Sequence, residues 1–388
     1  MQNILGDITP EVFLRDYWQK KPLLIRNAIP NIQCPISPEE MAGLACEEEV
    51  ESRIVIENLK GKPWQVKNGP FTEKDFRKSP NGPWTLLIQG IDHWVPELSE
   101  LLDRFRFIPN WRLDDIMASY APPGGSVGPH FDYYDVFLLQ AQGSRRWKIG
   151  PFCSAKSPRL QGTPLRILEN FETSTEWLLE PGDMLYLPPQ VAHYGIAEED
   201  CITLSIGFRS PTEDELLSSF TDHLMEFHGP EVHMDDPTLA LQSNPGEIQL
   251  DVLQKVRNIL LAKIDQPETM AQWFGEFVTS PKSDQLLFPP DEPISAKKVT
   301  RKLIQGEALK WNEGSRFAYI KSADQYITLF CDGHAFRRSP GESEFLQTLC
   351  EKSLINVSKL AQHLADLPEI TELLVQLINQ GSLYFPEL

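Results

Sequence analysis

The chain has 388 residues, which is too long for one ordinary hydrophobic core and predicts two or three domains. Its formal net charge of −19 argues against nonspecific binding to nucleic acid and is compatible with a basic partner, although acidity also simply favours solubility. We expect a cytoplasmic protein with reduced thiols and no membrane segment, because the sequence shows no signal peptide, no long apolar run and no Cys-x-x-Cys pair.

We interpret the N-terminal part of the chain as structural scaffold, in which the sequence shows little sign of chemistry. Residues 8–26 have a pattern that predicts a short helix followed by a buried strand. At Ser37 a capping residue precedes an acidic first turn, which predicts the start of a second helix. Residues 53–56 and 84–89 favour strands and are bounded by turn residues.

Residues 111–209 have a pattern that predicts consecutive β-strands separated by turns, and within them only residues 166–173 have a helical pattern. Such spacing predicts a closed or sandwiched antiparallel barrel. Two half-motifs of a cupin-like jelly roll lie within it, since five residues separate Gly124 from His130 and five separate Gly182 from Pro188. We therefore predict a jelly-roll barrel in this part of the chain.

The stretch 128–132 carries the strongest indication of chemistry. Side chains two residues apart in an extended strand point to the same face, so His130 and Asp132 converge, and a later antiparallel strand can supply His193. Two histidines and one carboxylate form the facial triad of non-haem Fe(II) oxygenases. Asp132 stands where cupins often have a second histidine, and Gln190 where they usually have glycine. The remaining histidines lack this context and are interpreted as structural: His93, His223, His228, His233, His334 and His363.

An Fe(II) triad of this kind needs an electron-donating cosubstrate, usually 2-oxoglutarate, whose distal carboxylate requires a fixed cation. Alternation along residues 143–149 places Arg145 on the same face as Trp147, with Arg146 on the other face. Arg145 is therefore the predicted inward cation, and its guanidinium can hold a carboxylate through two hydrogen bonds. The alternative is a pair of surface arginines on a hairpin.

Further polar side chains are candidates for the same cavity. Thr203 and Ser205 alternate with aliphatic residues on the last strand, and we place Thr203 on the cosubstrate side. Asp115 alternates in the same way on an earlier strand and could face a cationic substrate, with Tyr133 or Tyr134 beside it. Each of these residues could equally be a polar residue on the exterior of the barrel.

The strand pattern ends at residue 211, where helices begin. The expected helices lie near residues 213–220, 250–261 and 270–278. Residues 211–280 carry 13 Asp and Glu against 3 Lys and Arg. A helical unit this short buries little surface by itself, so we expect it to pack on the barrel, on a second subunit, or on both.

Beyond a linker at 281–294, residues 295–388 resemble a winged-helix module. The expected helices lie at 296–303, 342–350, 357–364 and 370–379, and the strands at 317–320 and 326–330. The module has 11 residues of each charge and no basic stripe, so we expect protein contact or a structural role and no direct DNA binding. The expected domains are a barrel with its scaffold at 1–210, a helical region at 211–280 and this module.

Landmarks along essentially the whole chain resemble the JmjC-type ribosomal oxygenases, and among them the bacterial arginine hydroxylases of a large-subunit ribosomal protein. The matching stretches are residues 17–22, 64–66, 111–115, 128–132, 134–137, 181–183 and 272–277. The resemblance implies a mainly β fold with α elements: a double-stranded β-helix, a helical dimerisation region and a winged-helix-like C-terminal domain. It also implies a homodimer.

The resemblance implies that His130, Asp132 and His193 hold Fe(II), and that Arg145 binds 2-oxoglutarate, with dioxygen as the other cosubstrate. Arginine at this position favours the bacterial branch, because many other JmjC enzymes have lysine there.

The implied substrate is an arginine of large-subunit ribosomal protein sixteen, hydroxylated at its β-carbon. The resemblance makes Asp115 the natural partner of the guanidinium, with Tyr134 and Ser205 as lesser candidates.

Three alternatives stay open from the sequence. The same chemistry can act on another target, as in a histidyl hydroxylase or a lysyl demethylase. The barrel can also be a non-catalytic dimeric scaffold, although an intact triad argues against this. A metal-dependent sugar isomerase of the cupin class is a third, but such sites usually contain more histidines.

Overall fold

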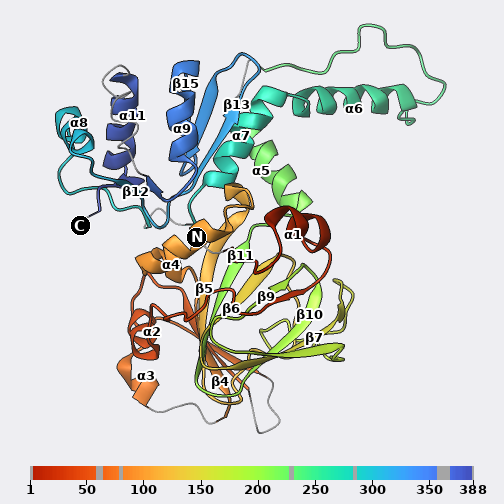
Figure 1. Ribbon diagram of the computed structural model, residues 1–388. Coiled ribbons are helices and arrows are strands. Elements are labelled where there is room, and N and C mark those ends of the chain that lie inside the picture. The colour runs from red at the N-terminus through yellow and green to blue at the C-terminus, as the bar shows by residue number, and fades with distance from the viewer. Residues whose placement is uncertain are drawn as a thin grey trace. The chain divides into compact units, whose positions relative to one another are not determined.

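The computed structural model describes residues 3–57, 64–77, 82–226, 231–282, 286–355 and 368–386. By its internal contacts the chain divides into two compact units (Figure 1). Unit 1 comprises Met1–Ser210, Lys282–Ser315 and Thr348–Leu388, and unit 2 comprises Pro211–Pro281 and Arg316–Gln347. None of the described helices combines the length and the apolar composition that crossing a membrane requires.

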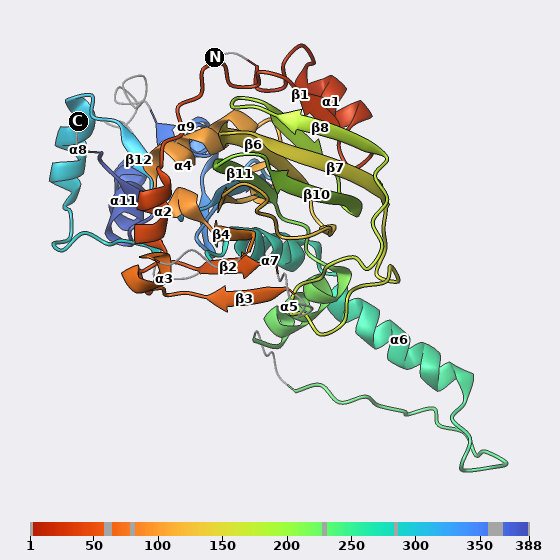
Figure 2. The same ribbon diagram turned by 90° about the horizontal axis from the view of Figure 1, so that it is seen from below.

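Unit 1 contains a barrel made of two antiparallel sheets (Figures 1 and 2). The larger sheet has the strand order β1 (Leu23–Ile25), β9 (Met184–Leu187), β6 (Val136–Gln142), β11 (Cys201–Phe208), β5 (Leu113–Ala121), β4 (Trp84–Ile88), β2 (Ser52–Ile56) and β3 (Gln65–Asn68). The smaller sheet has the order β10 (Val191–Ala197), β7 (Arg145–Phe152) and β8 (Thr175–Leu179). From β6 onward the chain crosses between the sheets, which confirms the predicted double-stranded β-helix.

Most strands of the larger sheet are buried on both faces, where N-terminal helices cover the outer side, while the edge strand β3 is largely exposed. These helices are α1 (Pro10–Asp16), α2 (Pro38–Leu44), α3 (Glu73–Arg77) and α4 (Pro96–Leu102). Phe13 of α1 packs against Tyr186 with ring centroids 4.8 Å apart, and Tyr186 packs against Phe137 at 4.9 Å. Each fully buried aromatic of this kind stabilises the fold by roughly 1.5–3 kcal/mol. The N-terminal segment that we predicted to be structural scaffold therefore supplies side chains to the core on the outer side of the larger sheet.

The start of α2 follows the predicted capping pattern. The Glu40 backbone N–H donates to Ser37 Oγ at 3.2 Å, and the Ser37 backbone N–H donates to Glu40 Oε2 at 2.8 Å. Two backbone donors that the helix leaves unpaired are thus satisfied reciprocally.

The remaining elements of unit 1 lie in the C-terminal part of the chain. They are α8 (Ala296–Ile304), α11 (Pro368–Asn379) and a sheet with the order β16 (Leu354–Ile355), β12 (Leu309–Trp311) and β17 (Leu383–Tyr384). These three short strands are additions to the sequence prediction. Strands of two or three residues are too short to show an alternation of polar and apolar side chains in the sequence.

Unit 2 combines helices with a three-stranded sheet. Its helices are α5 (Glu213–Glu226), α6 (Leu250–Ile264) and α7 (Pro267–Thr279), and its sheet is β13 (Phe317–Lys321), β14 (Ile327–Cys331) and β15 (His334–Arg338). Helix α9 (Ser343–Leu349) runs across the boundary of the two units. On α7, a Cβ added to Gly275 would lie only 2.3 Å from the Phe330 ring, so the glycine permits the helix to pack closely on β14.

Two local predictions are wrong. Residues 166–173 form no helix, because Ile167 and Leu168 are buried against the ligand-bearing segment and the Leu168 N–H donates to Pro129 O at 2.8 Å. Residues 131–135 do not form a regular strand either. Just before them, His130 forms an isolated antiparallel bridge with His193.

Some predictions lie outside the described residues. These are the helix at 357–364, His228 and His363. The compact units group residues 211–281 with 316–347 because α7 packs on the β13–β15 sheet. The boundary expected at 210 coincides with an edge of these units and the one at 280 lies one residue from another, whereas 295 is an edge of neither unit. The expected division into domains stays a prediction.

Candidate metal centre and adjoining cavity

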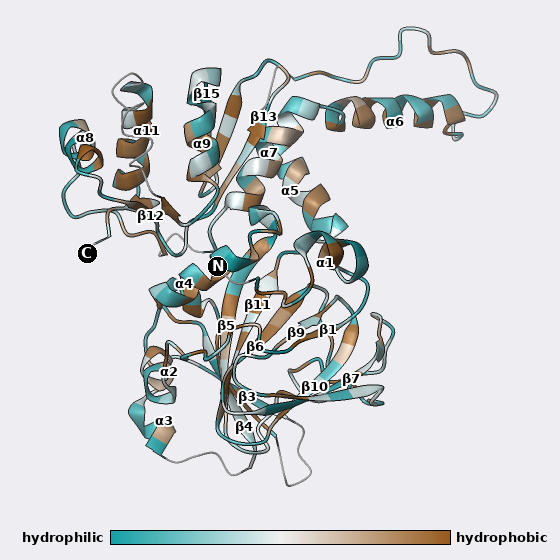
Figure 3. Ribbon diagram, in the orientation of Figure 1, coloured by the Kyte–Doolittle hydropathy of each residue, from teal (hydrophilic) through white to brown (hydrophobic). Residues whose placement is uncertain are grey.

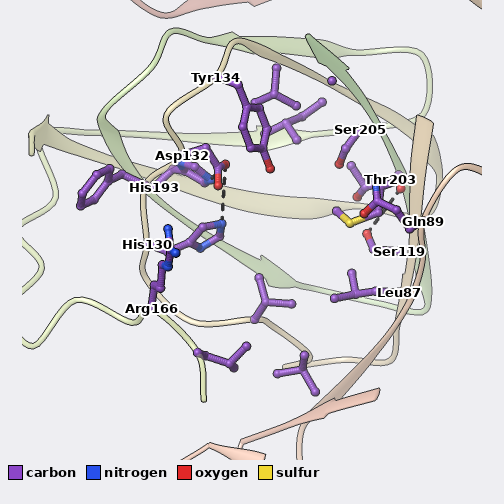
Figure 4. Close-up of a pocket in the computed structure, with 18 of the residues that line it drawn as sticks. Leu87, Gln89, Ser119, His130, Asp132, Tyr134, Arg166, His193, Thr203 and Ser205 are labelled. Carbon is purple, nitrogen blue, oxygen red and sulfur yellow. Dashed lines mark hydrogen bonds and ion pairs between the residues drawn. The ribbon is translucent and has the colours of Figure 1, made fainter. Parts of the chain in front are cut away.

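His130, Asp132 and His193 come together at one end of the barrel (Figure 4). Asp132 Oδ2 lies 3.9 Å from His130 Nε2 and 3.6 Å from His193 Nε2. Backbone pairing holds the two histidines in register, since the His130 N–H donates to His193 O at 3.0 Å and the His193 N–H donates to His130 O at 2.8 Å. Within the described part of the chain this is the one group of three such side chains with ligand atoms inside 4.8 Å.

The remaining ring nitrogen of each histidine is held by a backbone carbonyl. His130 Nδ1 lies 2.8 Å from Gly128 O, and His193 Nδ1 lies 3.0 Å from Val191 O. A carbonyl only accepts, so each Nδ1 carries the proton and each Nε2 presents a lone pair toward Asp132. Burial lowers the pKa of His193 to about 4, which keeps this ring neutral. The donor set and its orientation fit a divalent iron with open coordination positions.

Two backbone features position these ligands. Gly128 has φ +83°, and a Cβ there would lie 2.9 Å from Ile167. Gln190 has φ +67°, and its N–H donates to Asp132 O at 2.6 Å. The left-handed conformation explains why glycine is usual at this position, and glutamine adopts it at a cost of about 1–2 kcal/mol.

Arg145 is a buried cation without a carboxylate partner among the described residues. Its side chain follows the predicted alternation and is 2% exposed, which excludes the alternative of a surface arginine pair. Nη1 lies 3.4 Å from Ser119 Oγ, Nη2 lies 3.3 Å from Gly195 O, and Nε has no hydrogen-bond partner. A Cβ at Gly195 would lie 2.7 Å from Nε, so the glycine makes room for the guanidinium. An unpaired buried guanidinium fits an anionic ligand such as the distal carboxylate of 2-oxoglutarate.

The cavity of about 580 Å³ beside these groups is lined by both sheets. All the polar side chains predicted to reach it do so: Asp115, Tyr134, Arg145, Thr203 and Ser205. In Figure 4 the metal-binding group lies at one end, while Ser119, Thr203 and Ser205 lie at the other. The Thr203 hydroxyl donates to Gln140 Oε1 at 3.0 Å, which orients it within the barrel.

Asp115 is 3% exposed and is held by two residues that the sequence reading missed. Gln89 Nε2 donates to both carboxylate oxygens at 2.9 Å, and Lys282 Nζ lies 2.5 Å from Oδ2. Gln89 directly follows β4 and lines the cavity together with Leu87, two residues earlier, so alternation carried a signal for it. Lys282 belongs to a distant segment without a readable pattern.

Asp92 is a buried carboxylate next to this group. Its Oδ1 accepts the Ile116 N–H at 2.7 Å. Burial raises the pKa of Asp92 to about 8, and the Asp115 charge contributes. One buried carboxylate near Asp115 therefore prefers its neutral form.

Tyr134 borders the cavity with its hydroxyl directed inward and its side chain 43% exposed (Figure 4). The charge of Asp132 raises the pKa of the Tyr134 phenol, which therefore stays a hydrogen-bond donor. Tyr133 also lines the cavity, is 40% exposed, and packs edge-on against Phe131 at 5.3 Å.

Comparison with known proteins gives a consistent picture. Family models match residues 100–216 as a JmjC domain and residues 262–384 as a ROXA-like winged helix, which confirms the predicted winged-helix module. The chain is 36% identical to the ribosomal protein uL16 3-hydroxylase of Escherichia coli, over 96% of each chain. It is 40% identical to a probable ribosomal oxygenase of Haemophilus influenzae, over 72% of this chain and 70% of that one.

Solved structures agree with this. The E. coli ribosomal oxygenase YcfD in complex with cobalt and 2-oxoglutarate matches with a TM-score of 0.86 and 34% identity, over 98% of this chain and 99% of that chain. A YcfD structure with cobalt and succinic acid matches equally well. The rat ribosomal oxygenase 2 is 25% identical over 69% of this chain and 60% of its own. By sequence and by fold, the chain belongs to the family of JmjC-type ribosomal oxygenases.

Proposed function

We propose that this protein is an Fe(II)- and 2-oxoglutarate-dependent hydroxylase of an arginine side chain in the large-subunit ribosomal protein uL16, acting at the β-carbon. One observation carries the proposal: a His-Asp-His group and a buried guanidinium without a carboxylate partner among the described residues line the same cavity. The E. coli relative, named a uL16 3-hydroxylase, supports the substrate and the position.

His130, Asp132 and His193 hold the iron, and Arg145 holds the far carboxylate of 2-oxoglutarate with Thr203 on the same side of the cavity. When bound, iron, 2-oxoglutarate and dioxygen supply the oxidation that replaces a C–H hydrogen with a hydroxyl group and converts 2-oxoglutarate to succinate and carbon dioxide. The protein's own part is to orient these groups and to exclude water. The carbonyls behind each Nδ1 fix the histidine rings, and the barrel walls keep Arg145 dry.

The substrate guanidinium is bound by Asp115, with Tyr134 and Ser205 beside it. All three line the cavity, and Asp115 is the buried carboxylate of this group. A carboxylate can accept two parallel hydrogen bonds from a guanidinium, which favours arginine over neutral side chains.

The test is intact-mass analysis of purified uL16 after incubation with this protein, Fe(II) and 2-oxoglutarate. We expect a gain of one oxygen atom, which fragmentation places on the β-carbon of an arginine. The His130→Ala variant is the control and should give no gain. Oxygen on a histidine, or loss of a methyl group from lysine, would instead identify one of the rival activities, and no change would contradict the proposal.

The homodimer is also proposed, and α6 supports it. In Figure 3 hydrophobic and hydrophilic residues alternate along this helix, and six of its apolar side chains are 38–82% exposed. They are Leu250, Leu253, Val256, Ile259, Leu260 and Leu261. An exposed apolar stripe of this length is expected to be covered in the assembled protein. Light scattering should give about twice the mass of the monomer, and Leu253→Asp combined with Leu260→Asp should lower it.

The domain division follows the same proposal: barrel and scaffold at 1–210, dimerisation helices at 211–280, linker at 281–294 and winged-helix-like domain at 295–388. The equal numbers of acidic and basic residues in the last domain support protein contact over DNA binding. A ribosomal protein as substrate supports a cytoplasmic location.

A further inference from the structure

Lys282 places an ammonium group on the carboxylate at the cavity wall. Its Nζ lies 2.5 Å from Asp115 Oδ2 and 3.1 Å from Asp114 Oδ2. The Lys282 side chain is 36% exposed, whereas that of Asp115 is 4% exposed. Asp115 therefore already has a cationic partner before any substrate arrives.

The hydrogen bonds of Asp115 leave no room for a third partner on Oδ2. An ionised carboxylate offers about four acceptor positions, two on each oxygen. Gln89 Nε2 uses one on Oδ1 and one on Oδ2, and Lys282 uses the other on Oδ2. A guanidinium fork needs one position on each oxygen. Bidentate binding of an arginine to Asp115 thus requires either Gln89 or Lys282 to give up its position on Oδ2, and of these two only Lys282 carries a positive charge that repels the incoming guanidinium.

The charges around Asp115 lead to the same conclusion. Asp114 and Asp115 both pair with Lys282, and Asp114 also pairs with Arg209, whose Nε lies 3.4 Å from Asp114 Oδ1. Asp92 adds little negative charge, because burial favours its neutral form. A substrate guanidinium added beside Lys282 would leave an uncompensated positive charge in a partly buried place, which is unfavourable.

We propose that Lys282 competes with the substrate for Asp115 and sets the threshold of affinity that an incoming side chain must exceed, so that an arginine binds by displacing it and a lysine does so poorly. The inference rests on the proposed function, since it takes Asp115 as the partner of the substrate guanidinium. Arginine gains from the exchange because its planar fork engages both oxygens, whereas lysine replaces one point charge with another. The tethered Lys282 also has a high effective concentration, which raises the threshold for an incoming lysine.

Two substitutions of Lys282 have opposite expected effects. Lys282→Met removes the charge and keeps a similar length, and Lys282→Arg supplies a fork that can hold both oxygens. Affinity is measured by calorimetry under nitrogen, with Fe(II) and 2-oxoglutarate present, for a uL16 peptide with arginine at the target position and for the same peptide with lysine there. We expect Lys282→Met to bind the arginine peptide about fivefold more tightly, and Lys282→Arg to bind it about fivefold more weakly.

A third peptide, with alanine at the target position, separates competition from a general structural effect. Removal of Lys282 removes the same displacement cost for both cationic side chains, so Lys282→Met should raise the affinities for the arginine and lysine peptides by a similar factor. Competition at Asp115 leaves the affinity for the alanine peptide unchanged, whereas a general structural effect would change it as well.

Lys255 provides a matched control. Its Nζ lies 2.8 Å from Asp236 and 3.5 Å from Asp235, and its side chain is also 36% exposed. Its acidic partners are not among the described residues that line the cavity, whereas both partners of Lys282 are. Lys255→Met should therefore leave all three affinities unchanged.

Equal or weaker binding of the arginine peptide by Lys282→Met, while the wild type hydroxylates that peptide, would overturn the competition and leave the proposed function intact. If the wild type neither binds nor hydroxylates the arginine peptide, the proposed function fails and the competition fails with it. Where Lys282→Met does not fold, Lys282→Arg decides, because tighter binding by that variant contradicts the proposal.

Discussion

Replacing Arg145 with methionine should abolish binding of 2-oxoglutarate and leave the ligand-free protein at least as stable as the wild type. The guanidinium is 2% exposed, Nε has no hydrogen-bond partner, and burial lowers the pKa of Arg145. The charge is therefore kept in the barrel at a cost to the ligand-free fold, and an anionic ligand compensates it. Methionine fills most of the same space without a charge.

The two effects have different magnitudes. Removing one partner of a buried, hydrogen-bonded ion pair costs about 3–5 kcal/mol, which corresponds to a rise of roughly 10²–10⁴-fold in the Kd of 2-oxoglutarate. In the ligand-free protein, removal of an uncompensated buried charge is favourable, but contact with the Trp147 ring, 5.1 Å from Arg145 Cζ, is lost. Cation–π contacts contribute about 0.5–2 kcal/mol, so we expect a net change between zero and about 2 kcal/mol of stabilisation.

Two measurements check this. Calorimetric titration of 2-oxoglutarate with Fe(II) under nitrogen gives the Kd, and denaturant unfolding without 2-oxoglutarate gives the free energy of unfolding. Arg146→Met is the matched control, because Arg146 is 35% exposed and pairs with Glu176 and Glu198 on the surface. It should leave the Kd unchanged and cost less than about 1 kcal/mol. A Kd for Arg145→Met within threefold of the wild type would refute the reasoning.

Three further predictions follow from the same structure. His130→Ala should lose tight binding of Co(II), measured by calorimetry with the 82% exposed His233→Ala as control. The raised pKa of Asp92, about 8, means that the native protein keeps a proton that the unfolded chain releases above its ordinary value of 3.8. Stability should therefore fall as pH rises from about 4 to 8, by up to ~1.4 kcal/mol per pH unit, and Asp92→Asn should flatten this slope in urea unfolding at pH 5 and pH 8. Gly195→Ala should raise the Kd of 2-oxoglutarate, because the added Cβ would lie 2.7 Å from Arg145 Nε.

Each of these has a clear contrary result. Co(II) binding by His130→Ala equal to that of the His233 control would remove His130 from the ligands. Equal pH slopes for Asp92→Asn and the wild type would mean that Asp92 is ionised in the native protein. An unchanged Kd in Gly195→Ala would show that Arg145 has room to shift without loss of its ligand.

The two-residue alternation of side chains along the strands was sufficient to predict much of the barrel and its site. In the smaller sheet one strand face lines the cavity and the other meets solvent, so alternation along β7 correctly separates buried Arg145 from half-exposed Arg146. The spacing of His130 and Asp132 predicts their convergence correctly, although the segment after His130 is irregular. The predicted helix at 166–173 was wrong because tertiary contacts of Ile167 and Leu168 override its local pattern.

The sequence alone therefore determined which side chains share a face of a strand. Through the spacing of the histidines and the aspartate, it also determined the class of metal site. Tertiary structure alone decided which distant segments meet. The reciprocal backbone hydrogen bonds that bring His193 to His130 are one case. The contact of Lys282 with Asp115, 167 residues apart, is another. Periodicity is set by backbone geometry within one element, whereas such pairings depend on the packing of the whole unit, and no local pattern records them.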